Sequence, residues 1–200
     1  MNFLAHLHLG GERPGQLLGS LYGDFVKGPL QDRWPADIEA GIRLHRQIDV
    51  FTDSHPVVLQ AKQRFPRERR RYAGILVDLF FDHCLAAHWH DYASEPLPDF
   101  TARVYQVLRE EAELPAKLAL IAPRMAAQDW LGSYREFAVM EQVVAGMSRR
   151  LSRPEGLAGG ALELEQLYTP LLQDFREFYP QLHAFARARI IRPLDADWPS

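Results

Sequence analysis

The sequence predicts an all-α protein that folds as a single compact helical domain over residues 1–200. Apolar residues recur every three or four positions along most of the chain, which is helical spacing. Alternating apolar and polar runs bounded by Asn-Gly or Asp-Gly turns, the signature of β-hairpins, are absent. Proline and glycine separate the apolar segments. We expect no domain boundary, because the Gly-rich stretch at 153–160 leaves too short a tail to fold alone.

The first half of the chain divides into segments with helical spacing. Leu17, Leu21 and Phe25 fall on one helix face, and Gly28-Pro29 ends that segment. Pro35 precedes the next segment, whose acidic first turn suits the positive end of a helix dipole. We expect helices over 16–25, 36–52, 57–65 and 70–93.

The second half continues the helical pattern. Val104, Val107 and Leu108 give one segment an amphipathic face, and Pro170 and Pro180 are candidate kinks in the last one. We expect helices over 100–113, 115–127, 136–151 and 161–191, with a short turn at 130–134.

Composition limits the classes of function and location. Net charge is −3, which gives no general attraction to nucleic acid, so we expect no such partner. The only cysteine is Cys84, which excludes an intrachain disulfide and fits a reducing, cytoplasmic location. The apolar N-terminal run is short and lacks a basic start, and no other run approaches about 18 uncharged residues. We therefore expect no signal peptide and no membrane partner.

Histidine and aspartate are concentrated in the first ninety residues. Seven of the eight histidines precede residue 91. His45 and Asp49 are four residues apart on one expected helix, and so are Asp78 and Asp82, with His83 next to the second carboxylate. His6 and His8 lie in an apolar run that fits either a buried strand or the start of a helix.

These spacings favour a metal site on helices. Two carboxylates on an apolar helix need a compensating partner, because an isolated buried charge is very costly. Each pair alone has a commoner explanation, a surface hydrogen bond or an ion pair with Arg43 or Arg46, and only the joint pattern favours a cation. Imidazole with carboxylate suits manganese, iron or zinc, and carboxylate with water suits magnesium or manganese. Dinucleotide, P-loop, nucleophile-elbow and paired-cysteine motifs are absent.

Several ordered motifs resemble the acyl carrier protein phosphodiesterase family. The resemblance covers nearly the whole chain and rests on the segments MNFLAHLHL, GSLYGDFVKG, GIRLHRQIDVFTDSHP, RRYAGILVDLFFDHCLAAHW, WLGSYREF, MSRRLSR and DFREFYPQL.

The resemblance implies an activity and a fold. Such enzymes remove the 4′-phosphopantetheine group from holo acyl carrier protein and leave the apo protein. They look like relatives of the all-helical HD-type phosphohydrolases, so the expected fold is HD-domain-like. The expected cofactor is a divalent metal, Mn²⁺ first, with Mg²⁺ or Fe²⁺ as alternatives. The usual HD order places histidine before aspartate in the adjacent pair, whereas Asp82-His83 is reversed here.

Given that activity, we assign roles to the polar residues of the first half. Asp49 is expected to orient His45, as carboxylates often do for metal-bound imidazole. His55 or His83 is expected to protonate the departing serine oxygen. The candidate metal ligands are Asp24, His45, Asp78, Asp82 and His83.

Cations are expected to recognise the substrate, an acidic carrier protein joined through a phosphodiester. Lys27, Arg43 and Arg46 are candidates for holding the phosphate. Six cations between residues 62 and 71 form a basic run: Lys62, Arg64, Arg67, Arg69, Arg70 and Arg71. Arg67, Arg69, Arg70 and Arg71 of this run are expected to steer the acidic partner.

Two other functions remain open from the sequence. One is an HD-like phosphohydrolase that acts on a nucleotide or another small phosphoester. The other is a non-catalytic helical module that binds an acidic protein through its arginines and holds no metal.

Overall fold

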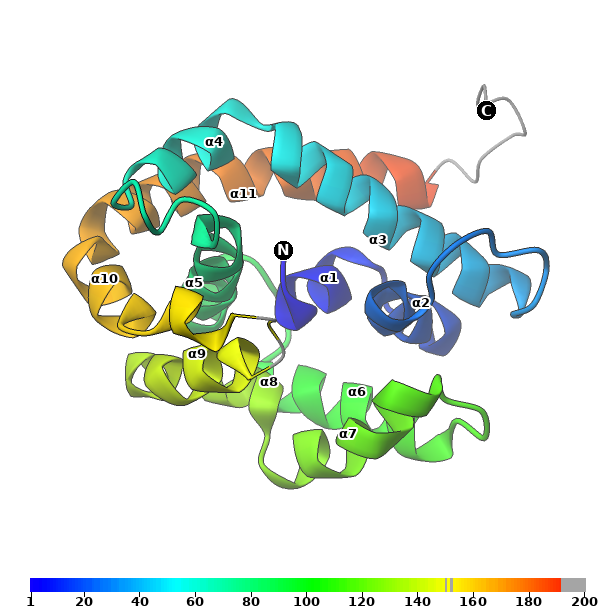
Figure 1. Ribbon diagram of the computed structural model, residues 1–200. Coiled ribbons are helices and arrows are strands. Elements are labelled where there is room, and N and C mark those ends of the chain that lie inside the picture. The colour runs from blue at the N-terminus through cyan, green and yellow to red at the C-terminus, as the bar shows by residue number, and fades with distance from the viewer. Residues whose placement is uncertain (150, 152, 192–200) are drawn as a thin grey trace.

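Every regular element of the computed structural model is helical across the residues it describes, 1–149, 151 and 153–191 (Figure 1). The α-helices are α1 (Phe3–Leu9), α2 (Pro14–Phe25), α3 (Ala36–Ser54), α4 (Pro56–Gln63), α5 (Ala73–Ala87), α6 (Leu97–Glu110), α7 (Ala116–Ala127), α8 (Trp130–Ser133), α9 (Met140–Ser148), α10 (Gly160–Gln166) and α11 (Tyr168–Ile191). Three single 3-10 turns complete them: η1 (Trp89–Asp91), η2 (Phe137–Val139) and η3 (Pro154–Leu157). The all-α prediction is confirmed.

The structure decides one open alternative and corrects two predicted elements. The run that contains His6 and His8 is a helix, α1, as one of the two alternatives had it. The helix expected over 70–93 is only α5, because residues 70–72 form a turn before it and a 3-10 turn follows it. The helix expected over 161–191 is divided between α10 and α11. Pro170 lacks an N–H to bond the carbonyl of residue 166, where α10 ends, but is tolerated in the first turn of α11.

The helices surround a central pair, α1 and α5. In Figure 1, α3, α4 and α11 pass along one side of α1, and α6 to α9 lie on the other. Helices α2 and α3 make the most extensive contact between any two elements. This arrangement places the N-terminal helix in the interior, where side chains from α2, α3 and α5 reach it.

One continuous hydrophobic core joins these layers. Phe80 and Phe81 of α5 are fully buried, and Phe81 packs against Phe175 and Phe178 of α11. None of the helices described is both long enough and apolar enough to cross a membrane.

Candidate metal centre

The centre begins with the close packing of α2 against α3. A Cβ on Gly19 would lie 2.7 Å from the Cα of Gly41, so the two backbones approach at a distance that only glycine allows. One turn further along both helices, a Cβ on Gly23 would lie 2.2 Å from Cγ of His45. Glycines four residues apart on α2 therefore seat the imidazole of His45 directly against the α2 backbone.

Helix α1 contributes a second imidazole. The ring of His6 stacks on the ring of His45, with 3.6 Å between centroids and 13° between planes. Asp82, which is fully buried on α5, fixes the first turn of α1 by accepting hydrogen bonds from the N–H groups of Leu4 (2.8 Å) and Ala5 (3.1 Å). This is a capping interaction between elements distant in sequence, and it sets the position of His6.

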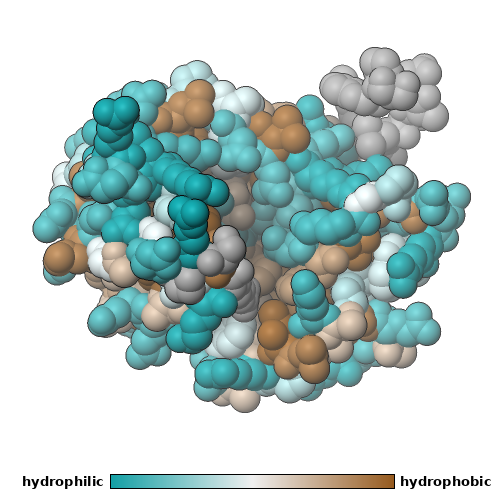
Figure 2. Space-filling view, viewed as in Figure 1, coloured by the Kyte–Doolittle hydropathy of each residue, from teal (hydrophilic) through white to brown (hydrophobic). Residues whose placement is uncertain are grey.

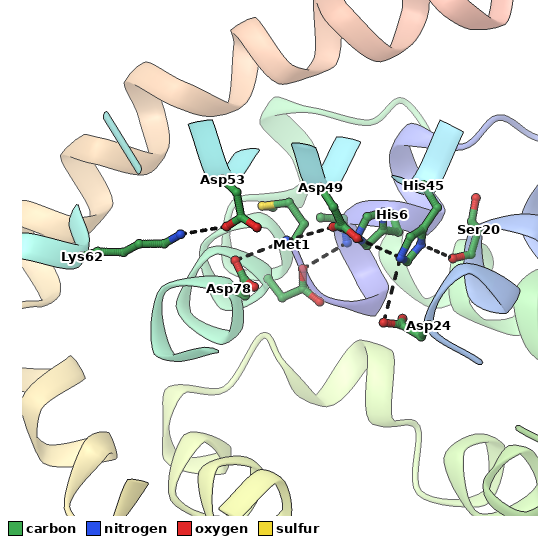
Figure 3. Close-up of polar contacts among 11 residues, drawn as sticks. Met1, His6, Ser20, Asp24, His45, Asp49, Asp53, Lys62 and Asp78 are labelled. Carbon is green, nitrogen blue, oxygen red and sulfur yellow. Dashed lines mark hydrogen bonds and ion pairs between the residues drawn. The ribbon is translucent and has the colours of Figure 1, made fainter. Parts of the chain in front are cut away.

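Asp49 faces both imidazoles from α3 (Figure 3). Its Oδ1 lies 3.1 Å from Nε2 of His6, and its Oδ2 lies 3.2 Å from Nε2 of His45. Asp24, at the end of α2, places Oδ1 4.0 Å from Nε2 of His45. The potential ligand atoms of His6, His45 and Asp49 all lie within 4.8 Å of one another.

The hydrogen bonds of the two imidazoles determine which ring nitrogen of each faces Asp49. Nδ1 of His45 donates to the carbonyl oxygen of Ser20 at 2.7 Å, so in the neutral ring Nε2 carries the lone pair. Nδ1 of the buried His6 has no hydrogen-bond partner, and its Nε2 is faced only by the carboxylate of Asp49 at 3.1 Å. Burial, together with the neighbouring His45, lowers the pKa of His6 to about 3, so this ring is neutral at physiological pH.

The carboxylate of Asp49 is ionised. Burial acts to raise its pKa, but the imidazoles of His45 and His6 outweigh that effect and hold the pKa well below its usual range. Two imidazoles and one carboxylate are the donor set of many divalent-metal sites. Ligands at about 2.1 Å from an ion stand roughly 3 Å apart, close to the two distances from Asp49. The residues present therefore fit a divalent cation.

The structure brings only part of the predicted ligand set together. His45 belongs to the cluster of His6, His45 and Asp49, and Asp24 lies at its edge, 4.0 Å from His45. Asp49 is itself a member of the cluster and does not orient His45 from behind. Asp78 lies beside the cluster, where its Oδ1 is 3.2 Å from the amino group of Met1. Both oxygens of Asp82 are occupied by backbone N–H groups, and burial raises its pKa to about 7.

The two histidines expected to act as proton donors lie away from the cluster. Nδ1 of His83 donates to the carbonyl of Tyr134 at 2.8 Å, and its Nε2 accepts from the hydroxyl of Tyr168 at 2.9 Å. Nδ1 of His55 accepts from the N–H of Val57 at the start of α4, and its Nε2 faces Gln181 of α11. Both rings are thus engaged in contacts between helices.

The predicted phosphate-binding cations differ in availability. Arg43 pairs with Glu39 at 3.2 Å, and Arg46 donates to the carbonyls of residues 26 and 28. Lys27 is exposed, with Nζ 3.4 Å from the carbonyl of Gly23, beside Asp24.

Ion pairs divide the basic run into two groups. Lys62, Arg64 and Arg69 pair with Asp53, Asp174 and Glu163, respectively. The other group has exposed side chains around the turn between α4 and α5 and consists of Arg67, Arg70 and Arg71. In Figure 3, Lys62 of α4 reaches toward Asp53, which lies beside Asp78 and Asp49.

Sequence reasoning did not assign a ligand role to His6. Its neighbours in the apolar N-terminal run predict burial, and burial alone does not separate a structural histidine from a ligand. The available signal was the polar residue itself, since a neutral imidazole inside an apolar helix needs a partner. The stacking on His45 depends on a contact between residues 39 positions apart, which spacing along one helix does not reveal.

Comparisons with known proteins identify relatives along nearly the whole chain. The sequence profile of a family described as "Acyl carrier protein phosphodiesterase" matches residues 1–182. A protein of that name from Yersinia pestis is 39% identical over 184 residues, which cover 91% of this chain and 95% of the relative. One from Yersinia enterocolitica is 37% identical over 193 residues, covering 96% and 100%. One from Photorhabdus laumondii is 38% identical over 184 residues, covering 91% and 93%. No solved structure matches the chain.

Proposed function

The chain belongs to the acyl carrier protein phosphodiesterase family, and from that premise we propose that His6, His45 and Asp49 form its hydrolytic metal centre. The reaction is hydrolysis of the phosphodiester that joins a serine of holo acyl carrier protein to 4′-phosphopantetheine. The observation that carries the assignment is the convergence of two buried imidazoles, His6 and His45, on the carboxylate of Asp49, with all three potential ligand atoms within 4.8 Å of one another. Family membership favours this substrate over a nucleotide, and an enzyme over a non-catalytic binding module.

A divalent cation at this centre supplies charge neutralisation for the phosphate and acidifies water. The chain itself supplies the ligand atoms in fixed positions. The Ser20 carbonyl holds the tautomer of His45, and the stacked rings hold His6 and His45 parallel. Mn²⁺ is our first candidate, because two imidazoles with a carboxylate suit it, and Mg²⁺ or Fe²⁺ are the alternatives.

Asp24 is placed to take part in proton transfer. It lies at the end of α2 with 42% of its side chain exposed, and faces His45 from the solvent side of the cluster. The attacking water loses a proton as its oxygen bonds to phosphorus, and a carboxylate at this edge is placed to accept it. The serine oxygen takes a proton as its bond to phosphorus breaks. Lys27, exposed beside Asp24, is placed to pair with the phosphate.

The direct experiment combines activity with metal binding. Holo acyl carrier protein is incubated with the enzyme and Mn²⁺, and mass spectrometry follows loss of the prosthetic group. His6→Ala is expected to lower kcat/KM at least a hundredfold. It should also abolish the rise in melting temperature that Mn²⁺ gives the native protein, since an ion bound only to the folded state stabilises it.

His90→Ala is the matched control, because His90 is exposed on η1 and lies outside the cluster. It should keep both the activity and the Mn²⁺-dependent melting shift. If His6→Ala keeps the shift and near-normal turnover, the centre is not at this cluster.

A further inference from the structure

An apolar groove lies between α7, α8 and α9. Its volume is about 900 Å³, and its walls include Ile121, Trp130, Val143 and Gly146. Leu120 of α7 also lines the groove and is 81% exposed. Figure 2 shows a brown patch low on this face of the molecule, beside a central hollow. Aliphatic surface of this kind marks a binding groove more often than a bare exterior.

The groove is continuous with the start of α1. Asn2 and Phe3 form part of its wall, and Phe3 is three residues from His6 on the same helix. Phe3 also stacks on Phe25, which follows Asp24, with 6.3 Å between ring centroids. One end of the groove therefore lies beside the residues that flank the metal centre.

The chemistry of the pantetheine arm of the substrate matches the lining of this groove. When its phosphate is at the cluster, the serine side belongs to a folded protein, while the other side is a long, uncharged chain with methyl groups and two amides. The groove offers aliphatic and aromatic surface together with the amide side chains of Asn2, Gln128 and Gln142, and the arginines at 124 and 149 also line it. This mixture of apolar walls and a few polar groups is typical of a small-molecule site.

We propose that this groove binds the pantetheine arm of the substrate, with the phosphate at the His6 end. The inference rests on the proposed function and adds the place where the leaving product is recognised. A groove that holds the arm orients the phosphorus for attack and distinguishes a phosphopantetheinyl serine from other phosphodiesters.

Gly146 of α9 provides a variant that fills the groove without disturbing the fold. A Cβ at this position would have only one neighbour within 4 Å, Nη2 of Arg149 at 3.8 Å. Leucine also has a higher helix propensity than glycine, so Gly146→Leu is expected to fold. The matched control is Ala102→Leu, which adds the same side chain to an exposed position of α6 outside the groove.

The test measures 4′-phosphopantetheine binding by calorimetry, and turnover of holo acyl carrier protein and of bis(p-nitrophenyl) phosphate. Gly146→Leu is expected to raise both the Kd for 4′-phosphopantetheine and the KM for holo acyl carrier protein at least tenfold. Hydrolysis of the small diester should stay within twofold of the unmodified enzyme, and Ala102→Leu should change nothing.

Equal Kd and KM in Gly146→Leu and the unmodified enzyme would overturn the proposal. So would a concentration-dependent dimer that this variant abolishes, because the groove would then be an interface between two copies. Failure of the unmodified enzyme to cleave holo acyl carrier protein would instead contradict the proposed function. In that case a comparison of 4′-phosphopantetheine binding by the unmodified enzyme and by Gly146→Leu still decides whether the groove binds the pantetheine arm.

Discussion

The hydrogen bonds of the ring nitrogens determine which buried histidines could bind a metal. His45 commits Nδ1 to a backbone carbonyl and keeps Nε2 for the cluster, whereas His83 commits both nitrogens to Tyr134 and Tyr168. In His6, Nδ1 has no partner and Nε2 faces only the carboxylate of Asp49. The three buried histidines therefore differ: His83 has both nitrogens bonded to groups outside the cluster, whereas His6 and His45 each direct Nε2 at Asp49.

His83 predicts a specific dependence of stability on pH. Burial lowers its pKa below the ordinary value of 6.5. The unfolded chain therefore binds a proton there that the folded chain does not, and this contribution to stability is lost as pH falls through 6.5. As pH falls further, the decrease in stability stops once pH is below the pKa of His83 in the folded protein. We expect the free energy of unfolding to fall less steeply between pH 7 and 5 in His83→Asn.

Urea denaturation at several pH values measures this difference. His90→Asn is the control, because His90 is exposed and its substitution should leave the slope unchanged. A parallel pH dependence in His83→Asn and the unmodified protein would show that His83 is protonated equally well in the folded state.

At the scale of helices, the spacing of glycines on α2 determines where α3 places its functional face. Gly15, Gly19 and Gly23 repeat every four residues, and a Cβ on each would collide with α3. The matching face of α3 carries Asp37, Gly41 and His45, again four residues apart. This is the spacing of the ridges by which two helices interdigitate, and it brings α2 unusually close to the imidazole.

Gly23→Ala tests this arrangement. The added Cβ would overlap the ring of His45, so we expect the ring to move away from the cluster. Metal affinity and kcat should both fall at least tenfold, and overpacking should cost about 1–3 kcal/mol of stability. Manganese titration followed by melting temperature, together with turnover, measures both effects.

Gly74→Ala is the matched control in α5, where a Cβ would have ordinary contact with Cε of Lys62 at 3.4 Å. It should keep metal affinity and gain slightly in stability. Normal manganese affinity in Gly23→Ala would mean that the position of His45 does not depend on this glycine.

For the molecule as a whole, charge is distributed unevenly around a net value of −3. A net negative charge does not attract an acidic partner, so any electrostatic attraction comes from a local basic surface. The exposed arginines Arg67, Arg70 and Arg71 lie in the turn between α4 and α5, the helix that carries Asp78. Arg69, which we also expected to dock the partner, instead ties this turn to α10 through Glu163.

Reversing the charge of these three exposed arginines to glutamate should raise the KM for holo acyl carrier protein at least tenfold at low ionic strength. kcat should change little, and the remaining KM should depend less on salt, because steering at the surface is screened by ions. Steady-state kinetics at two salt concentrations provides the measurement.

A variant with glutamate at Lys117, Arg135 and Arg187 is the control, since it makes the same change in net charge at exposed positions elsewhere. If both triple variants raise KM equally, total charge and not this surface governs the encounter with the carrier protein.

The sequence by itself determined the fold class, most helix positions and the family. Those features depend on local spacing, on proline and glycine, and on long ordered motifs, all of which can be read along the chain. It also made His45 and Asp49 candidates, because an i, i+4 pair on one helix is a local property, and Asp24 a candidate through a motif that resembles the family.

Only the tertiary structure separated ligand candidates from structural residues. Asp82 and Asp49 are both aspartates four residues after another potential ligand on the same helix. Asp82 nevertheless caps α1, because the first turn of that helix meets α5. His6 joins His45 because α1 lies in the interior next to α3. Both outcomes depend on contacts between residues far apart in sequence, where packing and not local pattern decides which polar atoms remain unpaired.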